Sequence, residues 1–371
     1  MRGTFLLLIL GLSFSCFSQD PYLFIGTYTK GNSKGIYVYR FNTSTGMGTE
    51  ISSVKSSNPS YLCIGPDGKH IYATNENGDS TASVVSYAFD PTAGRLAELN
   101  IQSSRGAYPC YIAEDKTGRW VFAANYGSGN LAAFPVNTDG SLAPATQVIQ
   151  HFGTGPNKER QEMAHVHSTI FSPDEKYLYV ADLGTDQEHI YAFDPTQLNP
   201  LSEARDSMVS LIPGTGPRHI VFHPARPYIY ILGELKGTID AYKYHADTGL
   251  LENFQTIRTT ETDFKGFPGS ADIHIRADGK FLYASNRGES NTLAVFAIQE
   301  DGRLVNKQFI SVNGKHPRNF VIDPTSRFLL VANRDTDNIV IFNIDPITGL
   351  LRASGKEISI PSPVCLKFLV Q

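Results

Sequence analysis

The chain has 371 residues, of which 41% are hydrophobic and 18% charged, and it contains 18 Tyr and 22 Phe. This content is enough for a large buried core or several small ones, as in a globular protein. Lys and Arg together number 32 against 36 Asp and Glu, for a formal net charge of -4. That balance gives no reason to expect nucleic acid or an anionic membrane as a partner, so any function must come from local sites.

The first twenty residues, MRGTFLLLILGLSFSCFSQD, have the pattern of a secretory signal peptide, with Arg2 before a short apolar stretch. We expect cleavage after Ser18, which makes residues 1–18 the signal peptide and residues 19–371 the mature protein. The apolar stretch is well below the ~20 residues that span a bilayer, which argues against stable membrane insertion. We therefore expect an exported protein, periplasmic or secreted. A lipoprotein attached through Cys16 is the weaker alternative, because the residues before it are a poor context for lipid attachment.

Three cysteines remain in the mature chain, namely Cys63, Cys110 and Cys365. An odd number of thiols in an exported protein argues against a disulfide framework. Each cysteine lies in an apolar, strand-like run, where Cys usually behaves as a small buried hydrophobe. We therefore do not expect a catalytic thiol.

The sequence repeats itself at a period of roughly 50 residues, which is typical of propellers and other repeat folds. Each copy has an apolar run, a turn rich in Pro, Asp and Gly, a second apolar run rich in Tyr, and a polar end. The copies are PSYLCIGPDGKHIYATNE, PCYIAEDKTGRWVFAANY, HSTIFSPDEKYLYVADL, RHIVFHPARPYIYILGEL, DIHIRADGKFLYASNR and RNFVIDPTSRFLLVANR. Their ends fall at Asn75, Asn125, Asp182, Gly233, Asn286 and Asn333.

Two further alternating runs follow each copy, separated by turns such as DTG or DG. Four short strands per repeat, with no helical periodicity, predict the blades of a β-propeller. At the N-terminus, YLFIGTYT, GIYVYRF and MGTEISSV match the second to fourth strands of one more blade, and the C-terminal PVCLKFLV matches its first strand. Pairing of the two ends closes the ring and removes exposed sheet edges. We predict an all-β, seven-bladed β-propeller that forms one domain over residues 19–371.

This architecture brings residues from distant parts of the chain to one face. The first strand of a blade is innermost and the second returns antiparallel to it, so the start of one and the end of the other emerge near the central channel. In GTGPRHIVFHPARPYIYILGEL, Arg218 and His219 should therefore converge with Glu234. The same rule brings to this mouth Glu76, Asn125, Tyr126, His165, His167, Asp182, Asp272, His274, Arg287, His316, Arg318 and Arg334. A mouth crowded with His, Arg and carboxylates predicts a small-molecule site.

Some of these residues also have a purely structural interpretation. We expect Asn75, Asn286 and Asn333 to shape loops by bonding backbone N–H groups. His165 and His167 share a strand face and suit a metal pair, but no compact set of carboxylates or Cys completes the pair in the sequence. We therefore predict neither a metal site nor a cofactor.

The stretches PRHIVFHP, GEL, ADIHIRADGKFLYASNRG and HPRNFVIDP closely resemble the seven-bladed propeller lactonase family. That family includes the propeller-type 6-phosphogluconolactonases and the fungal carboxy-cis,cis-muconate cyclases. The resemblance extends from YLFIGTYT to PVCLKF. It implies His167, Arg218, Glu234 and Arg287 as catalytic residues. Substrate-binding residues are then expected at Glu76, Tyr126, His165, Asp182, His219, His274 and Arg318.

Those residue types suit the hydrolysis of a sugar-acid lactone. His167 can serve as general base, with Glu234 orienting it or sharing the role. Arg218 and Arg287 can hold a carboxylate or phosphate and stabilise negative charge in the transition state. The resemblance makes conversion of 6-phospho-D-glucono-1,5-lactone to 6-phosphogluconate the nearest description. An exported enzyme would meet another lactone, because the phosphorylated lactone is a cytosolic metabolite.

Two alternatives stay open at this point. A muconate-type lactonising enzyme would use the same residues to grip carboxylates while a proton is delivered to carbon. A non-catalytic propeller would bind a sugar acid or a protein in the exported compartment, since propellers often serve as binding platforms. The set of His, Arg and Glu at the mouth favours the hydrolase. The expected partner is a small lactone or sugar acid, and the sequence carries no prediction of oligomeric state.

Overall fold

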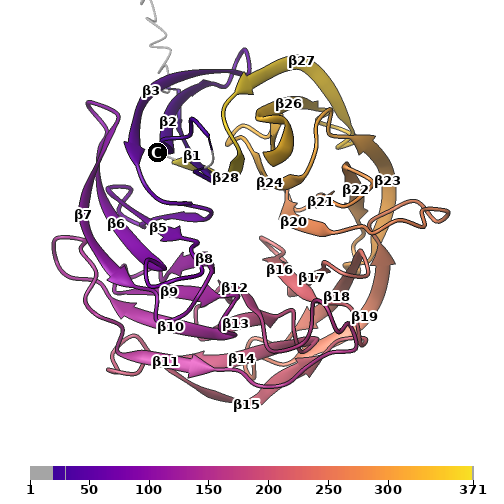
Figure 1. Cartoon of the computed structure of the whole chain (residues 1–371). Coiled ribbons are helices and arrows are strands. Elements are labelled where there is room, and N and C mark those ends of the chain that lie inside the picture. Colours follow the sequence, from indigo (N-terminus) through magenta and orange to yellow (C-terminus); the bar gives the residue numbers. More distant parts are fainter. Residues whose placement is uncertain (1–19, 30, 370–371) are drawn as a thin grey trace, which may run out of the picture.

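The structure is a computed structural model that describes residues 20–29 and 31–369. Seven four-stranded antiparallel sheets surround a central channel (Figure 1), which confirms the predicted seven-bladed, all-β propeller. Within these residues the one helical segment is the 3-10 turn η1 (Arg334–Thr336). This turn is far too short to cross a bilayer. The described residues include no helix that is long and apolar enough to do so. The expected signal peptide, with Cys16, lies outside the described residues.

The first blades after the N-terminal strands follow the chain in order, with the innermost strand first. Blade 2 has β4 (Leu62–Ile64), β5 (His70–Asn75), β6 (Ser83–Asp90) and β7 (Arg95–Ser103). Blade 3 has β8 (Pro109–Glu114), β9 (Trp120–Asn125), β10 (Asn130–Pro135) and β11 (Gln147–Gln150). Blade 4 has β12 (Val166–Phe171), β13 (Tyr177–Asp182), β14 (Gln187–Phe193) and β15 (Leu201–Ser210).

The remaining complete repeats continue this arrangement. Blade 5 has β16 (Pro217–Phe222), β17 (Tyr228–Gly233), β18 (Thr238–Tyr244) and β19 (Leu251–Arg258). Blade 6 has β20 (Ser270–Ile275), β21 (Phe281–Asn286), β22 (Thr292–Ile298) and β23 (Leu304–Ser311). Blade 7 has β24 (Pro317–Ile322), β25 (Phe328–Asn333), β26 (Asn338–Ile344) and β27 (Leu351–Ser359).

Blade 1 is built from both ends of the chain, as the sequence predicts. Its strands in order are β28 (Pro363–Leu369), β1 (Tyr22–Thr27), β2 (Gly35–Asn42) and β3 (Met47–Lys55). The register of the closing pair sets Phe24 opposite Lys367 and Gly26 opposite Cys365. Because β28 covers the inner edge of β1, the ring has no open edge at the junction of the termini.

The hydrophobic core lies between neighbouring blades. All six residues of β9 are buried, whereas most of the outer strand β7 is exposed or half-buried. Apolar side chains from facing sheets pack into shared clusters, as Tyr179 of blade 4 does with Ile231 of blade 5. The alternating Tyr-rich runs of the sequence therefore form the buried inner strands, since these strands pack against a neighbour on both faces.

The innermost strands carry a β-bulge at the same place in several blades. Cys110, His167, Arg218 and Arg318 are each an extra residue that the pairing with the second strand skips. A bulge sets two residues against one and re-aims the side chains. The repeated bulge therefore turns consecutive side chains of the first strand toward the channel mouth.

Another position that recurs in every blade lies directly after the second strand. There the backbone N–H bonds to a carbonyl of the segment that precedes the first strand. The residues in this position are Tyr28, Glu76, Tyr126, Leu183, Glu234, Arg287 and Arg334. They sit beside the bulges at one end of the channel, so two sets of equivalent positions supply the polar groups of the mouth.

The polar ends of the repeats have a structural role, but not through the bonds we expected. Asn286 and Asn333 donate from Nδ2 to the backbone carbonyls of Thr259 and Val312, at 2.8 and 3.2 Å, rather than accepting from N–H groups. Asn75 bonds to side-chain hydroxyls instead. Each of these amides ties the end of a second strand to the residue that follows the outer strand of the preceding blade.

We predict that removal of β28 unfolds the ring from its junction. A chain that ends at Ile360 loses the buried side chains Val364 and Leu366, each of which contributes about 1.5–3 kcal/mol, and exposes the edge of β1. We expect a loss of at least about 3 kcal/mol in unfolding free energy, measured by urea denaturation, with aggregation seen by light scattering. A chain that ends at Leu369 serves as the control. Equal denaturation midpoints for the two chains would contradict this account of closure.

Candidate active site

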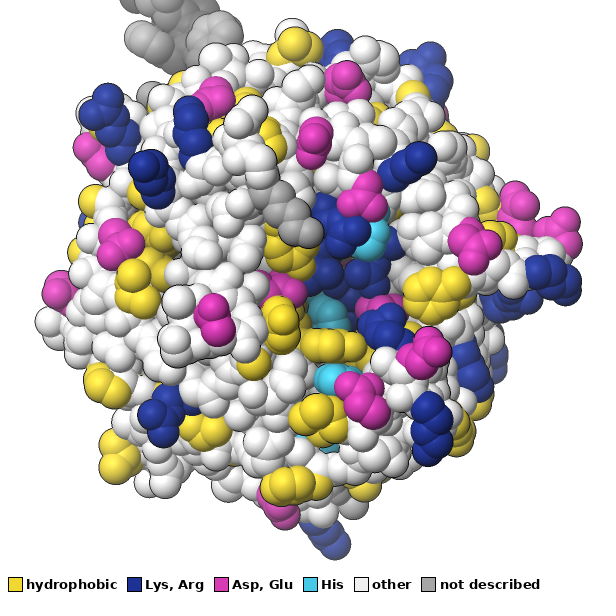
Figure 2. All heavy atoms as spheres, viewed as in Figure 1, with side chains coloured by type: hydrophobic (Ala, Val, Ile, Leu, Met, Phe, Trp, Pro, Cys, Tyr) yellow, Lys and Arg dark blue, Asp and Glu magenta, His cyan; other side chains and the backbone are white. Residues whose placement is uncertain are grey.

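The mouth of the channel is hollowed and strongly basic. Figure 2 shows Lys and Arg side chains at the centre of this face, with His and acidic side chains around them. One hollow of about 420 Å³ is lined by Arg160, Glu234, Phe267, Gly269, Arg287, Gly288, Asn291, Lys315, His316 and Asp335. A second, of about 360 Å³, is lined by Tyr28, Asn58, Glu76, Tyr108, Arg334, Asp335 and Ser362. The two hollows share Asp335, and both are within the size range of ligand pockets.

Glu234 is the centre of the charge network at the first hollow. Its Oε2 lies 3.1 Å from Nε of Arg218 and 2.6 Å from Nη2 of Arg287. Its Oε1 lies 2.7 Å from Nη2 of Arg160. The sequence prediction that Arg218, Glu234 and Arg287 converge is thus met in the structure, and one carboxylate holds three guanidinium groups.

These arginines keep Glu234 ionised. Burial alone would raise the pKa of this carboxyl group, but the charges of Arg287, Arg218 and Arg160 hold the pKa well below its usual value. A carboxylate of such low basicity is a fixed anion and not a proton acceptor. No hydrogen bond joins Glu234 to His167 in the described part of the chain, so the structure does not support Glu234 as the group that orients this histidine.

Arg218 is almost fully buried, with 1% of its side chain exposed, and several hydrogen bonds hold it in one position. Besides the bond to Glu234, its Nη1 donates to Nε2 of His219 at 3.0 Å and to the carbonyl of Ala271. His219 Nδ1 lies 2.7 Å from a carboxylate oxygen of Asp272. Burial and the charge of Arg218 lower the pKa of His219 to about 3, so the ring is neutral and can accept from the guanidinium. His219 therefore acts here as a support for Arg218.

Asp272 is the carboxylate that holds His219 in this network. Its Oδ2 accepts from Nε2 of His274 at 3.0 Å and from Nδ2 of Asn319. Burial opposes ionisation, but the contacts with His274 and His219 hold the pKa of Asp272 well below its usual value. The carboxylate therefore fixes which ring nitrogen of His219 carries the proton, which leaves the other nitrogen free to hold Arg218.

His167 is buried and does not line either hollow. Its ring contacts Tyr126 and His219 edge-on, with ring centroids 5.6 and 5.5 Å away. Nδ1 is 3.8 Å from the sulfur of Cys110. Burial, followed by the charges of Arg218 and its neighbours, lowers the pKa of His167 well below its usual value. The imidazole is therefore neutral at physiological pH and has a lone pair for a proton.

Arg318 forms a separate ion pair beside the second hollow. Its Nη2 lies 3.3 Å from Oε2 of Glu76, and its guanidinium lies 5.4 Å from the centre of the Tyr28 ring. The Tyr28 hydroxyl donates to the same Glu76 oxygen at 2.9 Å. Glu76 and Arg318 were both expected at the mouth, whereas Tyr28 was not singled out.

Arg160 is the main site residue that sequence reasoning missed. It belongs to the long connection between blades 3 and 4, which lies outside the repeat pattern. Its Nη2 bonds Tyr126 Oη at 3.3 Å as well as Glu234, and Tyr126 stacks on the ring of His165 with centroids 4.3 Å apart. Arg160 thus links Tyr126, which follows β9 of blade 3, with Glu234, which follows β17 of blade 5. Its side chain is 36% exposed, more than those of the other arginines on Glu234.

Comparisons with known proteins place the chain in one family. The family described as Lactonase, 7-bladed beta-propeller matches residues 22–368. The chain belongs to that lactonase family. A 6-phosphogluconolactonase of Bacillus subtilis (strain 168) is 37% identical over 350 residues, covering 94% of this chain and 98% of the relative. The family and this relative identify the chain as an enzyme of the lactone hydrolase type.

Solved structures lead to the same family. A periplasmic gluconolactonase of Pseudomonas aeruginosa superposes with a TM-score of 0.90 at 36% identity, over 94% of this lactonase and 99% of the other chain. A Bacteroides fragilis protein, provisionally named 6-phosphogluconolactonase, gives a TM-score of 0.91 at 41% identity, over 96% and 99% of the two chains.

Two residues expected in the pocket of this lactonase lie elsewhere. Asp182 is fully buried, and its carboxylate bonds His151 Nδ1 at 3.1 Å and the backbone N–H of His165 at 2.8 Å. It ends a second strand, where side chains turn between blades and not into the channel. His274 lies deeper along β20 than Asp272 and packs on Phe320, so its contact with the site passes through Asp272.

We predict that Glu234→Gln destabilises the lactonase. The amide leaves three guanidinium groups without their counter-charge, and loss of one member of a buried ion network costs about 3–5 kcal/mol. Sulfate supplies a replacement anion, so it should stabilise the variant more than the wild type. Urea denaturation with sodium sulfate, and with sodium chloride at equal ionic strength, measures both effects.

The matched control is Glu252→Gln, whose carboxylate side chain is 67% exposed. It should change the unfolding free energy by less than about 0.5 kcal/mol. If Glu234→Gln were as stable as this control, the charge network would not be holding the site together.

Proposed function

We propose that the chain hydrolyses the ring ester of a sugar-acid lactone, with D-glucono-1,5-lactone and its 6-phosphate as the nearest substrates. The observation that carries this proposal is the excess of positive charge at the first hollow, where Arg160, Arg287 and Lys315 face the two carboxylates of Glu234 and Asp335. Arg218 adds a further buried cation on Glu234. Such a site favours a ligand that is anionic or rich in hydrogen-bond acceptors. Its relatives include a 6-phosphogluconolactonase and a periplasmic gluconolactonase, which supports both substrates.

In this proposal the arginines divide between binding and catalysis. Arg160 and Arg287 line the hollow with Lys315, so they are placed to bind a phosphate or the polar end of a sugar acid. Arg160 is the more exposed of the two and can shift its guanidinium from Glu234 to the ligand. Arg218 is fixed below them by His219 and Ala271, and a fixed cation suits a developing oxyanion.

His167 is proposed as the general base. The neutral imidazole takes a proton from a water molecule as that water attacks the lactone carbonyl carbon, and Arg218 stabilises the negative charge on the carbonyl oxygen. The bond between the carbonyl carbon and the ring oxygen then breaks, and the ring oxygen receives the proton from His167. The products are a carboxylic acid, which ionises, and a free hydroxyl group.

We also propose that the mature enzyme, residues 19–371, is a single lactonase domain that works outside the cytoplasm. The signal-peptide pattern of residues 1–18 supports export, and so does the likeness to a periplasmic gluconolactonase. Export favours the unphosphorylated lactone as substrate. Lipid attachment at Cys16 remains the weaker alternative for the reason given above. No observation at the site favours the muconate-type reaction.

Substitution of His167 and Arg218 tests the proposed roles. We expect His167→Ala to lower kcat/KM by about 10²–10⁴-fold and Arg218→Lys by about 10²–10³-fold, because the base and the fixed oxyanion partner are lost. Hydrolysis of D-glucono-1,5-lactone and its 6-phosphate is followed by proton release on the mature protein, after subtraction of the buffer rate.

The control is His245→Ala, which removes a half-exposed histidine beside Glu252, at the opposite end of β18 from Gly233 and Glu234. Circular dichroism spectra and melting curves establish that each variant folds. Unchanged rates in folded His167→Ala and Arg218→Lys proteins would remove these two residues from the mechanism. A wild-type protein that opens neither lactone would contradict the proposed function.

The pH dependence of kcat/KM provides a separate test. The lowered pKa of His167 means that the neutral, active form persists below the ordinary histidine value of 6.5. We therefore expect kcat/KM to stay flat from about pH 8 to about pH 6 and to fall only at lower pH, as the imidazole finally takes up a proton. A fall centred near 6.5 would show an ordinary histidine instead. The residual activity of His167→Ala should lack this acid limb.

A further inference from the structure

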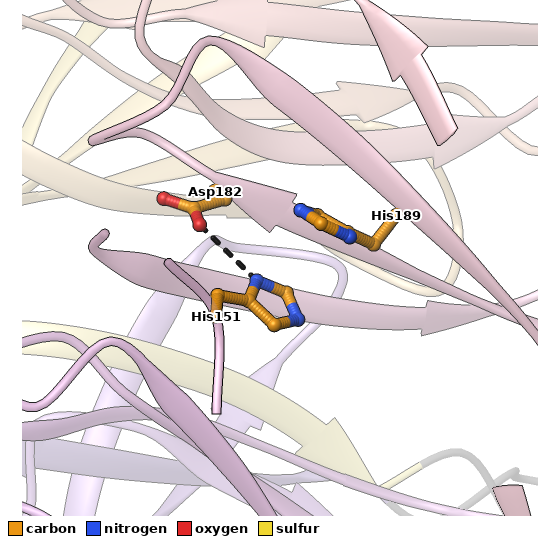
Figure 3. A group of neighbouring side chains, drawn as sticks. All are labelled: His151, Asp182 and His189. Atoms are coloured by element: carbon orange, nitrogen blue, oxygen red, sulfur yellow. Dashed lines mark hydrogen bonds and ion pairs between the residues drawn. The ribbon is translucent and has the colours of Figure 1, made fainter. Parts of the chain in front are cut away.

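A compact group of metal-ligating side chains lies outside the active site, between blades 3 and 4. His151 follows the outer strand of blade 3, Asp182 ends β13, and His189 lies on β14. Figure 3 shows the two imidazole rings and the carboxylate turned toward one another. One ligand atom from each residue lies within 4.8 Å of the other two. Two histidines and one carboxylate form a donor set that suits Zn²⁺.

The group has an unfilled position. Nε2 of His189 is buried and has no hydrogen-bond partner among the described residues. Its ring lies against that of His151, with centroids 3.8 Å apart. A buried ring nitrogen with no partner loses its contact with water and gains nothing in return. A cation bound between the three side chains would supply the missing partner.

The other two side chains are already oriented as metal ligands usually are. His151 Nε2 lies 2.9 Å from the Tyr191 hydroxyl, and Asp182 Oδ1 accepts from the backbone N–H groups of His165 and Gly184 at 2.8 and 3.0 Å. Such outer partners fix the ligand ring and the carboxylate. The Tyr191 hydroxyl can accept as well as donate. The proton of His151 can therefore sit on Nε2, which leaves Nδ1 free for a metal.

The distances require a modest adjustment. Ligand atoms on a tetrahedral Zn²⁺ with bonds of about 2.0–2.2 Å lie about 3.3 Å apart. His151 Nδ1 and Asp182 Oδ2 are already 3.1 Å apart. The His189 ring already contacts that of His151, so the ring has to turn until Nε2 faces these two atoms. No hydrogen bond of Nε2 to a described residue opposes that rotation. His189 is half-buried, whereas His151 and Asp182 are buried, so an ion can enter from its side.

We propose that His151 Nδ1, Asp182 Oδ2 and His189 Nε2 bind one Zn²⁺ ion, with water as the fourth ligand. The ion has a structural role, because it ties the outer end of blade 3 to blade 4. Through Asp182 it also fixes the backbone of His165, which directly precedes β12 and its bulge residue His167. Metal binding at this place therefore rigidifies the strand that carries the proposed base.

Titration of the mature protein with zinc chloride tests this site. The protein is first stripped with a chelator that is then removed, and binding is followed by isothermal titration calorimetry. We expect one Zn²⁺ per chain and a rise of several degrees in the unfolding temperature. His189→Ala should bind Zn²⁺ at least tenfold more weakly and lose that rise, and its melting curve without metal shows that it folds. His189→Gln, which keeps most of the volume, covers the case of a misfolded alanine variant.

The matched control is His245→Ala, which removes a histidine that is 32% exposed beside Glu252. It should bind Zn²⁺ as the wild type does. Hydrogen exchange at the His165 amide should slow on Zn²⁺ binding in the wild type and not in His189→Ala. Absence of one-to-one binding, or equal binding by the wild type and both His189 variants, would overturn the proposal and leave a hydrogen-bonded pair of His151 and Asp182.

Discussion

The pairing of β28 with β1 is the contact on which the geometry of the mouth depends. It closes the ring, and it also reaches the site directly. The backbone N–H of Leu366 on β28 donates to Oδ1 of Asn319 at 2.7 Å, and Nδ2 of Asn319 donates to Asp272. Asp272 holds His219, which in turn holds Arg218. The position of one buried guanidinium is therefore set through a continuous hydrogen-bonded path from the last strand of the chain. A slip of that strand by one residue would reverse its side chains and break the path.

Charge balance is the second constraint on the site. Placing Arg218 and Glu234 in a buried position costs solvation energy, and a buried pair recovers that cost only with good geometry and further hydrogen bonds. Both conditions are met here, since Glu234 has three cationic partners and Arg218 has two further acceptors. The result is a site held by mutual attraction of charges, with the aromatic rings of Tyr61 and Tyr111 packed edge-on against His219. Three cations on one carboxylate still leave an excess of positive charge, which an anionic ligand can neutralise.

The sequence predicts the fold well because each blade repeats the same pattern of strands and turns. It also predicts that Arg218, Glu234 and Arg287 meet, because strand ends on one face of a ring must converge. The prediction from sequence fails where the position of a residue in its repeat does not determine which way its side chain points. Asp182 occupies a strand end, but its side chain turns between the blades toward His151. Arg160 reaches Glu234 from a long connection that has no counterpart in the other repeats.

The same limit explains why the sequence does not predict the metal ligands proposed between blades 3 and 4. His165 and His167 invite a metal interpretation because they alternate along the chain. In the structure, however, His165 Nδ1 bonds the backbone carbonyl of Tyr126 and His167 Nδ1 lies near the sulfur of Cys110. His151 and His189 carry no such signal, because they belong to different blades and approach only when the sheets pack. Contacts between neighbouring sheets depend on side-chain direction and packing, which a periodic pattern does not specify.

The arginines at the channel mouth also lower the pKa of the proposed base. Arg218, Arg318 and Arg287 all lower the pKa of His167, after the larger effect of burial. A bound anion offsets part of that positive charge, so the pKa of His167 rises when a phosphate or carboxylate occupies the hollow. A base whose pKa moves up toward the working pH accepts a proton more readily in the transition state. An uncharged lactone lacks this effect, so a charged group remote from the reacting carbon contributes to kcat as well as to binding.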